Sequence, residues 1–166
     1  MSVSRRTLIG SVLALGGLAL LRRSHAAAPA PAKRKTFEVE KTDAQWKALL
    51  SPAAYDVLRH EGTERAGTSP LLDEHREGTF LCAGCALPLF SSKTKFESHT
   101  GWPSFYAPLP DAVETTEDRS FMMLRTEVHC RRCGGHLGHV FDDGPKPTGL
   151  RYCMNGVALS FRPAAR

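Results

Sequence analysis

The stretch RSFMMLRTEVHC, residues 119–130, alternates between two sets of side chains and ends on a cysteine. One set is Met122, Leu124, Thr126 and Val128, and the other is Arg125, Glu127 and His129. An alternation of period two is typical of a β-strand that covers a hydrophobic core with one face. We therefore predict a strand over 119–130, with its charged and histidine side chains on the face opposite the apolar set.

Two further segments have the character of strands. GTFLC, residues 78–82, is a short β-prone run that ends on a cysteine. LRYCMNGVALSF, residues 150–161, alternates and is predicted to form a single strand. Four of its side chains then share one face: Arg151, Cys153, Asn155 and Val157. Segments rich in glycine and proline separate the strands as turns, so the strands are expected to pair antiparallel.

Helical signals lie on the N-terminal side of these strands. In TDAQWKALL, residues 42–50, Thr42 and Gln45 stand at capping-box spacing. SPAAYDVLRH, residues 51–60, begins with a serine suited to an N-cap and a proline suited to the first helical position. The fold class predicted from these patterns is mainly β, of the α+β type, with two short N-terminal helices.

Four of the five cysteines form two Cys-x-x-Cys pairs, Cys82 with Cys85 and Cys130 with Cys133. Two such pairs offer four thiolates in the tetrahedral arrangement that structural Zn²⁺ prefers. Disulfide bonds are an alternative in an exported protein, and a redox-active Cys-x-x-Cys is another. We favour one structural zinc ion, because this spacing is cramped for a structural disulfide and two copies of the motif favour metal.

The fifth cysteine, Cys153, has no partner in this scheme. A lone cysteine in an apolar strand is often a small buried hydrophobe. A free thiol in an exported protein is, however, open to oxidation, so its presence favours a functional role. Arg151 and Asn155 flank it on the same strand face, and a nearby guanidinium favours the nucleophilic thiolate. Cys153 is therefore a candidate nucleophile.

The segment CGGHLGHVFDDG, residues 133–144, holds two histidines and a carboxylate at short spacing: His136, His139 and Asp143. A further metal site or ordinary loop residues are alternatives, because His-x-x-His is weak alone. Next to a thiolate, an imidazole can deliver a proton near neutral pH and a carboxylate can orient it.

An aromatic cluster in ESHTGWPSFY, residues 97–106, contains Trp102 and Phe105. These side chains are candidates either for the core or for the wall of a pocket that holds a small apolar group.

Residues 1–26 have the arrangement of a cleaved export signal, with a basic start, an apolar run and small residues before Ala26. Arg5 and Arg6 lie in SRRTLI, which resembles a twin-arginine signal. An ordinary secretory signal is the alternative, but two arginines behind the apolar run disfavour it. We predict export to the periplasm by the twin-arginine route.

Cleavage of this leader would lower the formal net charge from +5 to +1, because residues 1–26 carry four arginines and no acidic residue. The remaining chain has no basic stripe, so nucleic acid is not an expected partner. The apolar run is too short for a stable membrane anchor. Residues 27–36 are predicted to be a flexible Pro/Ala tether, and residues 37–166 one catalytic domain.

Five motifs, in this order, resemble the methionine-R-sulfoxide reductases, the MsrB family. They are Cys-x-x-Cys at 82–85, PLFSSKTKFESHTGWPSF at 88–105, Cys-x-x-Cys at 130–133, GGHLGHVFDDGP at 134–145 and GLRYCMNGVAL at 149–159. The likeness extends over residues 36–162. It implies two packed antiparallel β-sheets, short N-terminal helices and a structural zinc site in the two cysteine pairs.

The resemblance also implies roles for single residues. Cys153 is expected to attack the sulfoxide sulfur, His139 to supply a proton to the sulfoxide oxygen, and Trp102 to hold the S-methyl group. Phe105 is placed beside Trp102 in the substrate pocket on the strength of the aromatic cluster alone, and not of the resemblance. The polar residues expected around the sulfoxide are His136, Asp143, Arg151 and Asn155.

The chain departs from the family at one position of consequence. Many members carry a resolving cysteine before GWPSF, whereas residues 98–101 here read SHTG. We therefore predict a one-cysteine enzyme, a monomer, that reduces free or protein-bound methionine sulfoxide. Its sulfenic acid would be reduced by an external thiol, such as a thioredoxin-like protein. A zinc-stabilised β binding module and a one-cysteine peroxidase are the alternatives.

Overall fold

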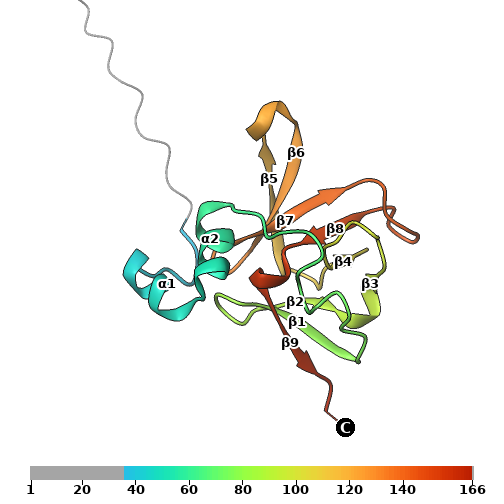
Figure 1. The fold of residues 1–166 in the computed structure, drawn as a ribbon, viewed down its shortest axis with the longest axis horizontal. Coiled ribbons are helices and arrows are strands. Elements are labelled where there is room, and N and C mark those ends of the chain that lie inside the picture. Colours follow the sequence, from blue (N-terminus) through green and yellow to red (C-terminus); the bar gives the residue numbers. More distant parts are fainter. Residues whose placement is uncertain (1–35, 166) are drawn as a thin grey trace, which may run out of the picture. The chain divides into compact units, whose positions relative to one another are not determined.

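The computed structural model of the protein describes residues 36–165. The predicted leader and all but the last residue of the predicted tether lie outside the described residues. Within them, nine strands form two antiparallel sheets (Figure 1). The three-stranded sheet has the order β2-β1-β9, and the six-stranded sheet has the order β3-β4-β8-β7-β6-β5. The predicted mainly β fold with two antiparallel sheets is confirmed.

The strands have the following bounds. They are β1 Gly78–Cys82, β2 Pro88–Ser91, β3 Lys95–Phe96, β4 Ser104–Phe105, β5 Val113–Asp118, β6 Arg125–Cys130, β7 His136–Phe141, β8 Arg151–Met154 and β9 Leu159–Pro163. Three single-turn 3₁₀ helices interrupt them: η1 Ser92–Thr94, η2 Ser120–Met122 and η3 Gly156–Ala158.

Both predicted helices form, and their caps are those expected from the sequence. Helix α1 (Asp43–Leu49) begins with a complete capping box, in which Thr42 and Gln45 each accept a hydrogen bond from the other's backbone N–H. Helix α2 (Pro52–His60) is capped by Ser51, whose hydroxyl accepts the N–H of Ala54. Within residues 36–165, the search for a helix long and apolar enough to cross a membrane finds none.

The core lies between the two sheets and beneath α2. Three fully buried phenylalanines join the sheets: Phe105 of β4 stacks on Phe90 of β2 at 4.4 Å between ring centroids and meets Phe80 of β1 edge-on at 4.9 Å. Val57 and Leu58 of α2 are buried in the same cluster. Burial of each such side chain contributes about 1.5–3 kcal/mol. This core supports β4 and β8 from below.

The structure corrects two predicted strands. Only Arg125–Cys130 of the segment 119–130 is a strand, because η2 turns the chain at Ser120–Met122 and Met122 has a left-handed φ of 57°. The segment 150–161 is two strands in different sheets rather than one. It is broken after Met154 by η3, so β8 belongs to the six-stranded sheet and β9 to the three-stranded one.

Candidate active site

Cys153 lies in the middle of the six-stranded sheet, between β4 and β7. It pairs with Ser104 on one side and with His139 on the other, and His139 pairs with Glu127 of β6. Residues directly opposite in antiparallel strands share a face of the sheet, so these four side chains form one row. Gly138 permits the close approach of β7 and β8, because a Cβ there would lie 2.1 Å from the carbonyl oxygen of Cys153.

The thiol of Cys153 is half-buried and is contacted by hydroxyl groups. Thr100 Oγ1 lies 3.8 Å from the Sγ atom, and Ser98 Oγ connects Thr100 (2.9 Å) to Ser104 (2.7 Å). Burial raises the pKa of Cys153, and the opposing effects of the Thr100 hydrogen bond and of the Arg151 charge are smaller. The expectation that Arg151 favours the thiolate is right in direction, but burial outweighs it and the resting group is a thiol.

Arg151 is occupied by the carboxylate of Asp143. Its Nε and Nη2 atoms each donate a hydrogen bond of 2.8 Å to Asp143, and its guanidinium lies 4.4 Å over the ring of Phe141. This pairing corrects the expected role of Asp143, which orients the arginine and not a histidine. The bidentate bridge lies at the start of β8, two residues before Cys153.

Other carboxylates hold the two histidines. His139 Nε2 lies 2.8 Å from Asp118 of β5, and His136 Nδ1 lies 2.8 Å from Glu127. The hydroxyl and backbone N–H of Ser120, and then His139, lower the pKa of Asp118, while His136 lowers the pKa of Glu127. Both carboxylates are therefore ionised acceptors near neutral pH.

The acceptor state of Asp118 determines the tautomer of His139. An ionised carboxylate can only accept, so Nε2 carries the hydrogen and Nδ1 is the basic nitrogen of the neutral ring. Burial lowers the pKa of His139, and Asp118 offsets this only in part. The site at rest thus contains a neutral thiol next to a neutral imidazole.

A pocket of about 130 Å³ opens above Cys153. Its walls are formed by Thr63, Trp102, Arg125, Gly138, His139, Phe141, Cys153 and Asn155. Trp102 and Phe141 make part of the wall apolar, while His139 and Arg125 bring polar groups to it. An apolar pocket with a few convergent polar groups beside a thiol is the usual form of a small-molecule site.

The structure brings only some of the predicted site residues to this pocket. Cys153, His139, Trp102 and Asn155 line it. His136, Asp143, Arg151 and Phe105 are absent from its walls. His136 is buried behind His139, with ring centroids 5.4 Å apart, and Phe105 lies in the core against Phe90. Phe105 therefore supports the sheet from below and does not touch the pocket.

Asn155 lines the pocket, but its amide is already used. Its Oδ1 atom accepts the N–H of Glu64 at 2.9 Å, and its Nδ2 atom donates to the carbonyl of Leu137 at 3.1 Å. It follows β8 as the N-cap of η3. These contacts make Asn155 a clamp between β7, β8 and the loop that contains Glu64.

Glu64, in the loop between α2 and β1, is a residue that sequence reasoning missed. Its carboxylate accepts the backbone N–H groups of Gly156 and Val157, and its carbonyl accepts the indole N–H of Trp102 at 3.2 Å. One residue thus ties the pocket tryptophan to the segment that follows Cys153. The sequence EGTERAG offers no periodic signal for this role.

Asp118, Arg125 and Thr100 were missed as well. Arg125 Nη2 lies 2.6 Å from Asp118 and lines the pocket. The alternation of residues 119–130 did place Arg125 and Glu127 on the polar face, which is the signal that could have found them. No local sequence pattern indicates that Asp118 binds His139 or that Thr100 contacts Cys153.

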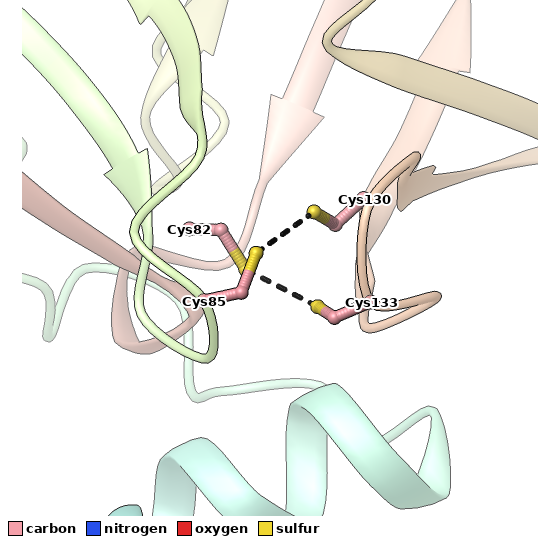
Figure 2. Close-up of side chains that lie close together, drawn as sticks. All are labelled: Cys82, Cys85, Cys130 and Cys133. Carbon is pink, nitrogen blue, oxygen red and sulfur yellow. Dashed lines mark hydrogen bonds between the residues drawn. The ribbon is translucent and has the colours of Figure 1, made fainter. Parts of the chain in front are cut away.

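The two Cys-x-x-Cys pairs converge at the ends of β1 and β6 (Figure 2). All four sulfur atoms lie within 4.8 Å of one another, with Cys82 3.7 Å from Cys133 and Cys85 3.5 Å from Cys130. A disulfide requires about 2.05 Å, and the cysteines are free. Tetrahedral M–S bonds of about 2.3 Å give sulfur separations of about 3.8 Å, which these distances match. The four-cysteine cluster therefore fits a structural metal ion.

A thiol at a pocket on a β-sheet, opposite a histidine and accompanied by four clustered cysteines that fit a structural metal ion, is typical of a thiol-dependent enzyme. Comparison with known proteins places it more narrowly. The SelR domain matches residues 50–163, and the chain belongs to the SelR domain family.

Curated relatives cover most of the described residues. A protein of Thiobacillus denitrificans named peptide methionine sulfoxide reductase MsrB is 58% identical over 124 residues, which are 74% of this chain and 94% of that one. Proteins of the same name from Leptospira interrogans and Methanosarcina barkeri are each 54% identical. The former match spans 76% of this chain and 97% of the relative, and the latter 75% and 88%.

Proposed function

We propose that the protein reduces methionine R-sulfoxide, free or within proteins, to methionine. The observation that carries this proposal is the position of Cys153 at a small, partly apolar pocket, directly opposite His139 and beside Trp102. The names of the relatives support the same activity. Repair of oxidised proteins is the role that such an activity would serve.

The chemistry begins with transfer of the Cys153 proton to His139. The basic Nδ1 of His139 accepts the thiol proton as Sγ attacks the sulfoxide sulfur, and the imidazolium then protonates the sulfoxide oxygen. The S–O bond of the substrate breaks as its protonated oxygen leaves. That oxygen then adds to Sγ as the Sγ–S bond formed in the attack breaks toward the substrate sulfur, and Cys153 is left as a sulfenic acid. The substrate sulfur gains two electrons, the cysteine sulfur loses two, and methionine leaves. Asp118 stabilises the imidazolium through Nε2.

Trp102 is the group that recognises the substrate's methyl. The indole N–H is bound to the Glu64 carbonyl, which fixes the ring as a wall of the pocket. A methyl group seated on the indole leaves only one epimer of the sulfoxide with its oxygen toward His139 and Arg125. This reasoning supports selectivity for a single epimer, in keeping with one repair enzyme per sulfoxide epimer. The choice of the R epimer rests on the resemblance to the methionine-R-sulfoxide reductases.

The sulfenic acid must be reduced from outside the chain. Thr100, a hydroxyl residue, is the residue that contacts Cys153 Sγ from the segment before GWPSF. The other four cysteines belong to the four-cysteine cluster. We propose an external thiol as the reductant, with a thioredoxin-like protein as the physiological donor.

Turnover of the two sulfoxide epimers tests the proposal. Wild-type protein with dithiothreitol should reduce N-acetyl-methionine R-sulfoxide and leave the S epimer, and Cys153→Ser should be inactive. Retained reduction by Cys153→Ser would refute the mechanism. Inactivity of a folded wild type would favour a binding module, and faster turnover of hydrogen peroxide than of sulfoxide would favour a peroxidase.

We propose that the ion held by the four-cysteine cluster is zinc. An all-thiolate tetrahedral set with no open position is typical of structural Zn²⁺ and leaves no room for a bound water. When bound, the ion would supply charge for four thiolates, which repel one another without it. Metal analysis of the purified protein should give one zinc per chain, and iron in its place would refute the assignment.

We also propose export to the periplasm through a twin-arginine signal. The proposal is supported by Arg5 and Arg6 ahead of the apolar run. The double substitution Arg5→Lys and Arg6→Lys should hold the protein in the cytoplasmic fraction. The matched control changes Arg22 and Arg23 to lysine, which leaves the motif intact and should leave export unchanged. Export of the first variant would refute the route.

A further inference from the structure

The methionines of the described chain differ sharply in exposure. Met154, beside the nucleophile in β8, is fully buried, whereas the side chain of Met122 is fully exposed and that of Met123 is half exposed. Both exposed methionines lie in the turn between β5 and β6, and Leu124 next to them is 70% exposed. Three consecutive exposed apolar side chains are unusual on a soluble surface and call for a reason.

This turn is where oxidants reach methionine in residues 36–165. An exposed thioether is oxidised to a sulfoxide by peroxides, and burial protects the sulfur of Met154. Figure 1 shows the turn at the free end of the β5–β6 hairpin. Met122 therefore presents its sulfur on a projecting element, as an extended or looped protein substrate would.

The pocket at Cys153 requires such a projecting substrate. Its volume of about 130 Å³ lies below the range of about 300–1,000 Å³ that is usual for small-molecule pockets. That space accepts the end of one side chain and excludes a folded element. A methionine at the tip of a hairpin can enter it without unfolding, which a buried methionine cannot do.

The turn is also fixed to its own hairpin. Ser120 donates its N–H to Asp118 at 2.8 Å, and Arg125 bridges Ser120 and Asp118. Asp118 in turn holds His139. A turn held by these contacts beside its own site is poorly placed to fold back into that site, so its sulfoxide must be delivered to another molecule.

We propose that Met122 and Met123 are a modification site of this protein, oxidised to sulfoxides and repaired by Cys153 of a second copy. The inference rests on the proposed function. In the first step a peroxide transfers one oxygen to the thioether sulfur and is itself reduced to water or an alcohol. In the second step that oxygen passes to Cys153, which becomes a sulfenic acid as methionine is restored. Two external thiols then return Cys153 to the thiol and release water.

The experiment separates the substrate copy from the enzyme copy. Metal-loaded Cys153→Ser protein is oxidised with hydrogen peroxide, freed of oxidant and mixed with a catalytic amount of active protein carrying Met122→Leu and Met123→Leu. Dithiothreitol supplies the electrons. Trypsin releases SFMMLR, residues 120–125, and YCMNGVALSFRPAAR, residues 152–166 of the wild-type sequence, because Arg162 precedes a proline and is not cut. Mass spectrometry therefore reads the exposed and buried methionines separately.

The expected result is oxidation of the 120–125 peptide, with the peptide of the buried methionine largely unmodified. Active enzyme should then remove about half of the sulfoxide and stop, because peroxide makes both epimers and one is repaired. Preferential oxidation at Met154, or no loss of sulfoxide from 120–125, overturns the inference. Cys153→Ala serves as a second substrate copy if Cys153→Ser does not fold.

A parallel assay keeps the two proposals distinct. The same active protein is given N-acetyl-methionine R-sulfoxide under identical conditions. Reduction of this compound without repair of residues 120–125 refutes the self-repair site alone. Failure with both substrates refutes the proposed function and the inference together.

Discussion

Replacement of Thr100 by cysteine should convert the protein from a one-cysteine to a two-cysteine enzyme. Thr100 Oγ1 lies 3.8 Å from Cys153 Sγ, and a disulfide needs about 2.05 Å, so a thiol at this position has to move by less than about 2 Å. A sulfenic acid condenses with a neighbouring thiol to a disulfide. The effective concentration of a thiol placed this close greatly exceeds that of any reductant in solution.

The size of the effect can be estimated from the stabilisation that a disulfide between positions 100 and 153 would give. The two positions are 53 residues apart in sequence, and closing a loop of that length restricts the unfolded chain by about 4 kcal/mol. Oxidised Thr100→Cys should therefore unfold at a clearly higher denaturant concentration than its reduced form. Strain in the bond would lower this gain.

The assay is one turnover with methionine R-sulfoxide in the absence of reductant. Wild type should release about one methionine per chain and retain a sulfenic acid that dimedone labels. Thr100→Cys should release the same amount, lose reactivity toward dimedone, and give a peptide linked through residues 100 and 153. Ser98→Cys is the matched control, because Ser98 contacts Thr100 and Ser104 and has no hydrogen bond to the sulfur. A dimedone-reactive Thr100→Cys would refute the geometric argument, and a disulfide to Cys153 in wild type would refute the one-cysteine mechanism.

Three further results are expected. Asp118→Asn should lower kcat/KM by about 10²-fold or more, because the tautomer of His139 is no longer fixed; an unchanged value would remove Asp118 from the mechanism. On the acid side, the pH profile of kcat/KM should keep its plateau below pH 6.5, since burial lowers the pKa of His139 and acidification abolishes activity when that base is protonated; an acid limb centred above 6.5 would contradict this. Glu64→Ala removes the carboxylate that fixes this loop to Gly156 and Val157, so the backbone carbonyl that binds Trp102 is no longer held in place. It should raise KM and weaken epimer selectivity more than it lowers kcat, and Glu64→Gln should restore part of the loss; equal effects on KM and kcat would indicate a structural role only.

Local patterns in the sequence predicted the elements whose signals are local. The capping box at Thr42, the N-cap at Ser51 and the short strand 78–82 all form as expected, because each depends on residues within four positions. The strand over 150–161 failed for a non-local reason. Glu64, more than ninety residues upstream, accepts the backbone N–H groups of Gly156 and Val157 at the point where the chain passes from one sheet to the other.

The candidate site residues also divide into those with a local sequence signal and those without one. The sequence singled out Cys153 and the two cysteine pairs because cysteine chemistry is rare and the spacing of the pairs is distinctive. The structure brings the four paired cysteines together and places Cys153 at a pocket. Asp118, Glu64 and Thr100 were not found, since a carboxylate or hydroxyl has many surface uses. Asp118 acquires its role through the sheet register, and the loop residues Glu64 and Thr100 acquire theirs through tertiary contacts. The expected partner of His139 was Asp143, four residues away, whereas the actual one is 21 residues away on β5.

The four-cysteine cluster and Cys153 are connected only through the fold. One cysteine pair lies at the end of β1, in the three-stranded sheet, and the other lies at the end of β6, in the six-stranded sheet. A metal ion bound by both pairs would therefore join the two sheets across the core that supports β4 and β8. The same bonds withdraw four thiols from the redox chemistry of the chain. A metal ion bound there would leave Cys153 without a partner among the other four cysteines. The proposed dependence on an external thiol would then follow from the fold as much as from the residue at position 100.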